Sequence, residues 1–387
     1  MLKIAYISPS YFSVADLPLI NQLRELCDIH YYVHLPHDGK GHAINISKMP
    51  KSSGIYLGTH FDEMQIFSGY IDLSKTHIIY HESPHSWAIS NIRVTKQLLN
   101  ELKKQNFDII HITDPYRYFE FPLYKFRKKT VLTVHDPFIH SSQKKWYAKR
   151  FYRFLSFKLI KKFILFNQAQ QADFMRTWEL SEEQVYLSRL GIYNYLQLYE
   201  KPAHNNADYA LYIGTIRSHK GVEYLLEAFE QVHAKDDKAR LIVAGAGNFY
   251  FDVSPYLNKP YITFIHKYLT TEEQVELISN AKYIVCPYKD ATQSGVVMSA
   301  FAFNKPCIAT NVGGLPEMVI DNKYGKIVPP SSSEELAKAM LLFNENPANI
   351  LLNYSNNIFA DFSTGEKSWK SIAKNTYQNV YERMIRQ

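Results

Sequence analysis

The sequence predicts an α/β protein made of two doubly wound, Rossmann-like domains. Short runs rich in β-branched and aromatic residues alternate with longer segments of helical period along the 387 residues. This alternation is typical of parallel sheets that helices cover on both faces. The pattern restarts at Tyr209, and one hydrophobic core rarely serves more than roughly 250 to 300 residues. Two domains are therefore expected.

The strand-like runs form two series. The first consists of KIAYIS, IHYYVH, IYLG, HIIYH, DIIHIT, TVLTVH and KKFILF, and the second of YALYIG, ARLIVAG, YITFI, YIVCP, PCIAT and KIVPP. Helical patterns such as LPLINQLREL and VTKQLLNELKKQ separate some runs of the first series. In EYLLEAFEQVHA, which follows YALYIG, one apolar stripe holds Leu225, Leu226, Phe229 and Val232. Such a stripe predicts a helix that packs on a sheet.

The domain boundaries are expected in polar stretches. The segment YLQLYEKPAHNNAD has a proline, two asparagines and no apolar period, which is typical of a linker. We predict an N-terminal domain over residues 1–195, a linker over 196–208 and a C-terminal domain over 209–360. Residues 361–387 are predicted to form a C-terminal helix, because their apolar residues recur at helical spacing. The spacing does not identify the partner of this helix, and packing back on the N-terminal domain is one alternative.

The composition excludes several classes of protein. Apolar residues make up 46% and charged residues 21% of the chain, so a disordered or low-complexity protein is excluded. The cysteines, Cys27, Cys286 and Cys307, are odd in number and widely spaced, which argues against a disulfide framework or a zinc site. No basic leader and no run of about 18 uncharged apolar residues occurs. A cytoplasmic protein is therefore expected.

The segment YIGTIRSHKGVEYLLEAF carries the strongest local signal. A strand ends at Gly214, a loop follows with Arg217 and Lys220, and a helix begins after Gly221. Glycine lets the backbone come close to a ligand, and basic side chains beside a helix N-terminus can bind an anion. The alternative interpretation is an exposed basic loop of an ordinary βα unit.

A second segment, residues 287 to 319, combines a helix start with a glycine pair. Ser294 can cap the apolar helix VVMSAFAF, so a phosphate could bind at its N-terminus. The strand PCIAT then leads to Gly313 and Gly314, with Glu317 three residues further on. This arrangement suits a close approach of the backbone to a polar ligand.

These two segments resemble the C-terminal half of the retaining glycosyltransferases of family 4. The motif residues Gly214, Lys220 and Gly221, followed by Leu225 and Ala228, match one family pattern, and AFAFNKPCIATNVGGLPE matches a longer one. The resemblance covers residues 209 to 335 well. It implies the GT-B fold, in which two Rossmann-like domains face a central cleft. It also implies transfer of a sugar from a nucleotide-diphosphate donor to an acceptor hydroxyl, with retention.

The resemblance also implies roles for single residues. In VLTVHDP, His135 and Asp136 correspond to positions near the transferred sugar, although a histidine at a strand end is often only a hydrogen-bonded structural residue. His266 and Lys267 correspond to positions near the base. The implied donor-binding residues are Gly214, Arg217, Lys220, His266, Lys267, Gln293, Ser294, Gly295, Ser299, Gly313, Gly314 and Glu317.

This chain departs from the family pattern in three places. Thr215 stands where the family has arginine, so Arg217 is expected to join Lys220 at the diphosphate. The first strand ends in SPSYF without the family's glycine pair. Ala291 and Ser299 replace a pair of glutamates. Asp290 is therefore expected to hold the sugar and is our third catalytic candidate, after His135 and Asp136.

The departures leave alternatives open. The missing glutamates would suit a catalytically inactive GT-B-like module that binds sugar nucleotides. The run GAGNFY begins like a dinucleotide fingerprint but lacks its third glycine, so it gives an NAD-dependent oxidoreductase little support. No Asp-x-Asp clamp occurs, so neither a metal nor another cofactor is expected.

The segment from Lys144 to Lys162 mixes eight basic residues with aromatic residues and leucines. It predicts either an ordinary exposed basic helix or a surface that contacts anionic lipid headgroups. The net charge of +7 suits an anionic ligand or membrane but is too diffuse to indicate nucleic acid. We expect a saccharide or lipid-linked saccharide acceptor, a peripheral position on the inner membrane face, and a role in bacterial-type surface polysaccharide or glycolipid synthesis.

Overall fold

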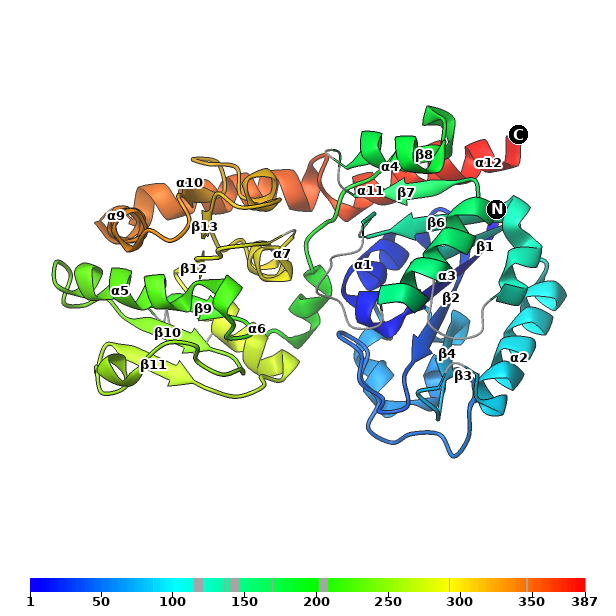
Figure 1. Ribbon diagram of the computed structural model, residues 1–387, viewed down its shortest axis with the longest axis horizontal. Helices are drawn as coiled ribbons and strands as arrows, with labels where there is room; N and C mark the ends of the chain where they lie inside the picture. The colour runs from blue at the N-terminus through cyan, green and yellow to red at the C-terminus, as the bar shows by residue number, and fades with distance from the viewer. Residues whose placement is uncertain are drawn as a thin grey trace. The chain divides into compact units, whose positions relative to one another are not determined.

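The computed structural model forms two compact units, and both are Rossmann-like α/β units, as the sequence predicts (Figure 1). The first unit comprises Met1–Gly191 and Trp369–Gln387, and the second comprises Ile192–Ser368. The residues that the structure describes are 1–85, 87–114, 121–135, 137–138, 146–166, 168, 170–201, 208–291, 293–345 and 347–386.

The first unit contains an eight-stranded sheet with the order β3-β4-β2-β1-β5-β6-β7-β8. Its pairs are parallel except for β3 and β4, which are antiparallel. The strands are β1 Lys3–Pro9, β2 Asp28–Leu35, β3 Gly54–Leu57, β4 Thr76–Tyr80, β5 Ile109–Thr113, β6 Thr130–Val134, β7 Phe163–Leu165 and β8 Val185–Leu187. The sequence analysis missed β8, because this strand has three residues and only Val185 is buried.

Helices cover both faces of this sheet. The alternate residues Ala5, Ile7, Leu132 and Val134 pack with α2, α3 and α4 in one apolar core, and the helix α1 packs against α11 (Figure 1). The helices of this unit are α1 Ser13–Leu23, α2 Ile89–Gln105, α3 Trp146–Leu159, α4 Gln171–Trp178, α11 Trp369–Thr376 and α12 Glu382–Arg386.

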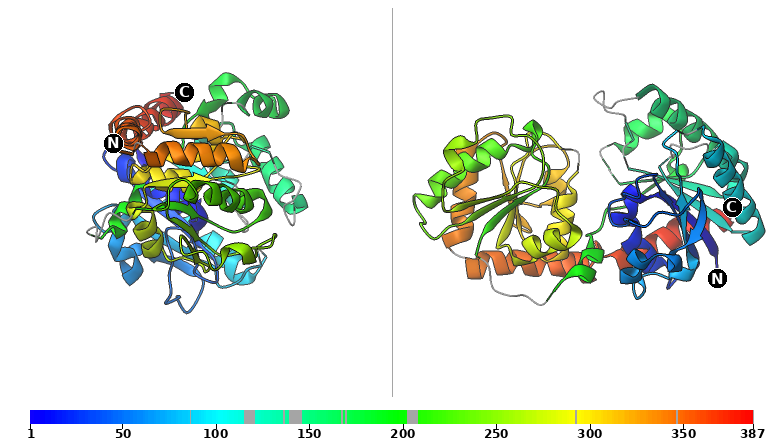
Figure 2. Two further views of the ribbon diagram at one scale, coloured as in Figure 1. Left: turned by 90° about the vertical axis from the view of Figure 1, so that its left-hand side faces the viewer. Right: turned by 90° about the horizontal axis from the view of Figure 1, so that it is seen from below.

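The second unit contains a six-stranded parallel sheet with the order β11-β10-β9-β12-β13-β14. The helix α5 packs against α9, and α6 packs against α7, on opposite faces of the sheet (Figure 2). The strands are β9 Ala210–Ile213, β10 Leu241–Ala244, β11 Ile262–Ile265, β12 Tyr283–Cys286, β13 Cys307–Thr310 and β14 Gly325–Val328. The helices are α5 Val222–His233, α6 Thr271–Asn280, α7 Gly295–Ala302, α8 Leu315–Met318, α9 Ser333–Glu345 and α10 Pro347–Phe359.

The sequence predicts domain boundaries after residues 195 and 360. The first division falls after Gly191, and the second after Ser368. The segment from Asn194 to Tyr199, where the linker is expected to begin, is a 3-10 helix that contacts α6 and α7. Tyr195 and Leu196 are buried there. Apolar residues in a polar stretch thus add this turn to the second unit.

A buried histidine anchors the C-terminal segment within the first unit. The ring of His111 is 1% exposed, and its Nδ1 lies 2.6 Å from the hydroxyl oxygen of Tyr381. Its Nε2 lies 2.6 Å from Oγ1 of Thr133 on the neighbouring strand. Burial lowers the pKa of His111 to about 3, so the ring is neutral and uses one nitrogen as donor and the other as acceptor. The C-terminal segment therefore completes the polar core of the first sheet.

None of the helices within the described ranges combines the length and the apolar character that a membrane span needs.

Tyr381→Phe should lower the free energy of unfolding by about 1 to 3 kcal/mol, because it leaves a nitrogen of His111 buried without a partner. Denaturant unfolding measures this loss. Tyr377→Phe is the control, since its hydroxyl makes no hydrogen bond within the part of the chain that the structure describes. Equal losses in the two variants would contradict the anchoring role of His111.

Candidate functional site

Two loops that begin with glycine lie at the carboxyl edge of the second sheet. Gly214 follows β9 and Gly245 follows β10, with φ angles of +144° and +145°. A Cβ atom on Gly245 would lie 1.8 Å from the carbonyl oxygen of Gly214. The N–H of Ile216 donates to the carbonyl of Ala246 over 2.9 Å. Glycine is therefore needed for the two loops to run side by side, and it leaves their backbone open to a ligand.

A cavity of about 170 Å³ opens beside these loops. Of the predicted residues, Gly214, Lys267 and Ser299 line it. Lys267 also forms an ion pair with Glu273, with Nζ and Oε1 2.5 Å apart. His266 is fixed next to it, since its Nε2 lies 2.5 Å from the carbonyl oxygen of Gly247. The cavity thus gathers three of the twelve predicted donor-binding residues.

The sequence analysis missed other residues of this cavity. Tyr268, which is 87% exposed, and Gln274 of α6 both line it. The available signal in the sequence was that Tyr268 directly follows His266 and Lys267. Gln274 had none, because a glutamine in a helix is ordinary.

The loop after β9 carries the two predicted cations. Arg217 is exposed, whereas Lys220 is half-buried at the end of a 3-10 turn. The ammonium of Lys220 lies 3.7 Å from the ring centroid of Tyr288. Burial lowers the pKa of Lys220, and the nearby guanidinium of Arg217 adds to this effect. An anion bound here would offset both the loss of hydration of the ammonium and its repulsion from Arg217.

Ser294 caps the helix α7, which begins at Gly295, as the sequence predicts. The hydroxyl of Ser294 accepts from the N–H of Val297 over 3.4 Å, and this residue is only 3% exposed. Gln293 and Gly295 flank the cap and are accessible. The first N–H groups of a helix have no intrahelical acceptor and carry the positive end of its dipole. This terminus is therefore suited to a phosphate.

The glycine pair lies close to the start of α7. Gly313 adopts a φ of +50°, and Gly314 precedes α8. The N–H of Ser294 contacts the sulfur of Met318, the last residue of α8, at 3.4 Å, so α8 lies beside the start of α7. Glu317, on α8, is exposed. Asp290 is also exposed, and its N–H lies 3.4 Å from the carbonyl oxygen of His219, in the loop after β9 that carries Lys220.

In the first unit, His135 follows β6. Its ring stacks on Phe12, with centroids 3.8 Å apart and planes at 7°, and it also contacts Phe166. Burial lowers the pKa of His135 to about 3, so the imidazole is neutral near pH 7. Asp136 lies outside the described residues.

A buried carboxyl group, which the sequence analysis missed, shares a small cavity with His135. Asp16 is 2% exposed and accepts hydrogen bonds from Tyr6, over 2.7 Å, and from Ser8. Thr113 donates in turn to the hydroxyl of Tyr6 over 3.0 Å. Burial raises the pKa of Asp16 to about 7. A charged residue within the apolar run SVADLPLI was the signal that could have identified it.

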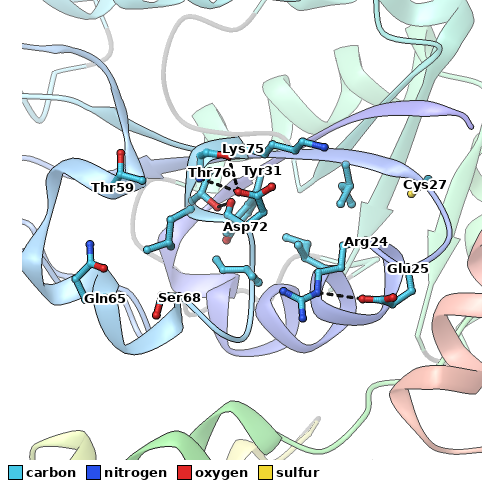
Figure 3. Close-up of a pocket in the computed structure, with 15 residues that line it drawn as sticks. Arg24, Glu25, Cys27, Tyr31, Thr59, Gln65, Ser68, Asp72, Lys75 and Thr76 are labelled. Carbon is cyan, nitrogen blue, oxygen red and sulfur yellow. Dashed lines mark hydrogen bonds and ion pairs between the residues drawn. The ribbon is translucent and has the colours of Figure 1, made fainter.

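A larger cavity, of about 600 Å³, lies at the amino ends of β2 and β4 (Figure 3). It contains none of the predicted site residues. Arg24 pairs with Glu25 at 3.4 Å, and Lys75 pairs with Asp28 at 2.6 Å. Its basic groups are thus matched by carboxylates, whereas Arg217 and Lys220 form no ion pair within the part of the chain that the structure describes.

Within the described ranges, no group of three or more His, Cys, Asp and Glu side chains could hold a metal ion.

Two family models match the chain. Residues 207–346 match the model described as Glycosyl transferases group 1, and residues 58–193 match Glycosyltransferase Family 4. The predicted site residues of the second unit all fall within the first match, and His135 falls within the second. Both halves of the chain therefore carry glycosyltransferase family domains.

Curated relatives match part of the chain. Alpha-D-kanosaminyltransferase of Streptomyces kanamyceticus is 24% identical over 155 residues, which are 39% of this chain and 40% of the relative. An uncharacterized glycosyltransferase of Methanocaldococcus jannaschii is 26% identical over 186 residues, 47% of this chain and 50% of the relative. The chain thus spans half or less of the length of these relatives.

Solved structures match over the whole chain. Sucrose-phosphate synthase of Thermosynechococcus elongatus has a TM-score of 0.64 at 18% identity, and Anabaena HepE in complex with UDP has 0.61 at 15%, each covering 100% of both chains. The UDP-GlcNAc 2-epimerase of Methanocaldococcus jannaschii has 0.60 at 13%, covering 98% of this chain and 100% of its own. These likenesses show the GT-B fold, which transferases and epimerases share.

The buried carboxyl group of Asp16 should make stability depend on pH. Its folded pKa of about 7 exceeds its ordinary value of 3.8, so the folded state keeps a proton that the unfolded state loses. Stability from this group is full below about pH 4 and is lost as pH rises through 7. Asp16→Asn should flatten the thermal-unfolding profile between pH 4 and 8, by on the order of 2 to 4 kcal/mol.

Asp62→Asn, at an exposed aspartate of the same unit, is the control and should leave the profile as it is. A wild-type slope that survives in Asp16→Asn would contradict the assignment.

Proposed function

We propose that this protein is a glycosyltransferase that moves a sugar from a uridine-diphosphate donor to an acceptor hydroxyl. The proposal rests on three features at the carboxyl edge of the second sheet. There a half-buried lysine, a capped helix N-terminus and bare glycine backbone occur together in the region that matches the group 1 model.

The chemistry requires that the leaving diphosphate be neutralised as the bond to the sugar breaks. Lys220 and Arg217 supply positive charge, and the first N–H groups of α7 supply oriented dipoles. Fixed donors of this kind stabilise the developing charge without a nucleophile from the protein. No metal is needed in this scheme, because the cationic side chains take its place.

The cavity beside Gly214 is the proposed place for the nucleoside. Lys267, Ser299 and Gln274 offer hydrogen bonds there, and the ring of Tyr268 is free to stack on a base. We favour uridine because HepE, a structural neighbour, was solved with UDP and with UDP-glucose.

The sugar itself must be held without the pair of glutamates that this chain replaces by Ala291 and Ser299. We propose that the carboxylate of Asp290 accepts hydrogen bonds from the sugar. This carboxylate is exposed, and the N–H of Asp290 lies close to the carbonyl oxygen of His219 in the loop that carries Lys220. The backbone at Gly313 and the carboxylate of Glu317 are further candidates near the start of α7.

The first unit would receive the acceptor. His135 is neutral and can exchange hydrogen bonds with a hydroxyl group. We assign it, with Asp136, to the reaction centre because of the family resemblance, which also suggests retention of configuration.

A lipid-linked acceptor would suit the surface of α3. Phe151 and Phe154 are 59% and 49% exposed. Lys158, in the last turn of α3, and Lys161, two residues after its end, are also exposed. Aromatic and basic side chains together favour anionic lipid headgroups. We therefore propose a peripheral position on the cytoplasmic membrane face and a role in surface polysaccharide or glycolipid synthesis.

The proposed function is tested by release of UDP from UDP-glucose and related donors, with EDTA present. Hydrolysis or transfer above the rate of the Lys220→Ala variant would support it. Tight binding of UDP without turnover of any donor would favour an inactive sugar-nucleotide binding module. Interconversion of donor sugars without release of UDP would favour an epimerase, whose fold is shared.

Asp290→Asn should lower turnover about tenfold or more and leave the affinity for free UDP nearly unchanged, because UDP has no sugar for this carboxylate to hold. Initial rates and calorimetry give the two quantities. Asp237→Asn, at another exposed aspartate of the second unit, is the matched control. If both variants match the wild type, the sugar contact must come from elsewhere.

The double variant Phe151→Ser, Phe154→Ser should bind vesicles of phosphatidylglycerol about tenfold more weakly than the wild type, because it loses buried apolar area. Lys158→Glu with Lys161→Glu should also weaken binding and reduce its dependence on salt, since each cation adds about 1 kcal/mol near such a surface. Vesicle co-sedimentation at several salt concentrations measures both effects.

Lys103→Glu with Lys104→Glu, on the exposed end of α2, is the charge-matched control. The same loss in this control, or equal binding to phosphatidylcholine, would refute the α3 surface.

A further inference from the structure

The ammonium of Lys220 rests on a buried aromatic ring. Its Nζ lies 3.7 Å from the centroid of Tyr288, well within the range of a cation–π interaction. Tyr288 is 2% exposed, and Lys220 is half-buried. The ring thus replaces part of the water shell of the ammonium on one side and leaves the other side open.

Backbone contacts on both sides of the pair fix this arrangement. The carbonyl of His219 accepts from the N–H of Lys289 over 2.8 Å. On the other side, Gly221 has a φ of +65°, and a Cβ atom there would lie 2.0 Å from the carbonyl oxygen of Pro287. Lys220 and Tyr288 are therefore the central residues of two segments that touch before and after them. The contact between the side chains follows from the fold of the loops.

Tyr288 also contacts the start of α7. Its hydroxyl oxygen lies 3.4 Å from Oγ of Ser294, the residue that caps this helix. Its carbonyl accepts from the hydroxyl of Thr310 on β13 over 2.5 Å. One immobile residue thus borders both groups that the proposed function assigns to the diphosphate.

We propose that Tyr288 is a positioning residue for the donor diphosphate, whose ring holds the ammonium of Lys220 at a fixed place beside the N-terminus of α7. This inference rests on the function proposed above. A free lysine side chain loses much rotamer entropy when it binds a phosphate. A lysine already held on a ring has lost part of it, so the diphosphate binds more tightly.

A double-mutant cycle on Lys220 and Tyr288 tests the proposal, with UDP and inorganic pyrophosphate as probes in calorimetry. Tyr288→Leu should weaken binding of both probes about tenfold, within the range of a desolvated cation–π contact. In the Lys220→Ala background, Tyr288→Leu should have no further effect. A residue with only a structural role would lower affinity in both backgrounds alike.

Conservative variants separate the ring from the hydroxyl. Tyr288→Phe keeps the ring and should lose less than about threefold in affinity. Tyr283→Leu is the matched control, because Tyr283 is a buried tyrosine of β12, the strand that ends two residues before Tyr288, and its ring packs on Phe343. It should lower stability as Tyr288→Leu does and leave the affinity for UDP unchanged.

The outcomes are distinct. If the wild type binds UDP and the two substitutions are additive, Tyr288 does not position Lys220, and the proposed function stands. If the wild type binds neither probe, both proposals are refuted. If Tyr288→Leu does not fold, Tyr288→Met replaces it in the cycle with the same expected loss.

Discussion

The site in the second unit depends on one contact between two loops, where the backbone after Lys220 meets the backbone before Tyr288. Only glycine fits at position 221, since any Cβ would lie 2.0 Å from the carbonyl oxygen of Pro287. A methyl group there would force the loops apart by about 1 Å or more, because Cβ atoms essentially never lie within 3.0 Å of such an atom. The lysine, the ring beneath it and the helix cap at Ser294 would then lose their common geometry. The place of the positive charge of Lys220 at this edge of the sheet thus depends on the glycine at position 221.

The first unit depends on a different constraint, which is the need to satisfy buried polar groups. His111, Tyr6 and Asp16 lie inside the first unit, where each unpaired polar atom would cost about 1 to 3 kcal/mol. Tyr381 satisfies one nitrogen of His111. The last residues of the chain are therefore part of the core of the first unit, although residues 192 to 368 separate them from the rest of it in sequence. Without them, the histidine would face the interior with an open hydrogen-bonding position.

The sequence predicts most of the fold but only part of the candidate site. Apolar runs predicted every strand except β8, whose three residues are too few for a pattern. The cap at Ser294 and the loop with Lys220 could be predicted because they are local signals. Asp16 was missed although its place in an apolar run was a local signal. The partnership of Lys220 with Tyr288 could not be predicted, because it depends on a contact between segments far apart in sequence. Tyr288 in particular resembles any other buried aromatic residue until the fold brings a cation onto its face.

The two units also differ in the charge that they offer near pH 7. Among the described residues around His135, burial keeps both histidines neutral and raises the pKa of Asp16 to about 7. Near Lys220 lie the cation of Arg217 and the N-terminus of α7, which carries the positive end of a helix dipole. A low-dielectric pocket whose histidines are neutral would disfavour a diphosphate, because the charge of the diphosphate would be desolvated without compensation, but it can accept a hydroxyl group. Under the proposed function, the second unit has to carry the whole charge of the donor, which would explain why the half-buried Lys220 is held in place by both backbone and ring.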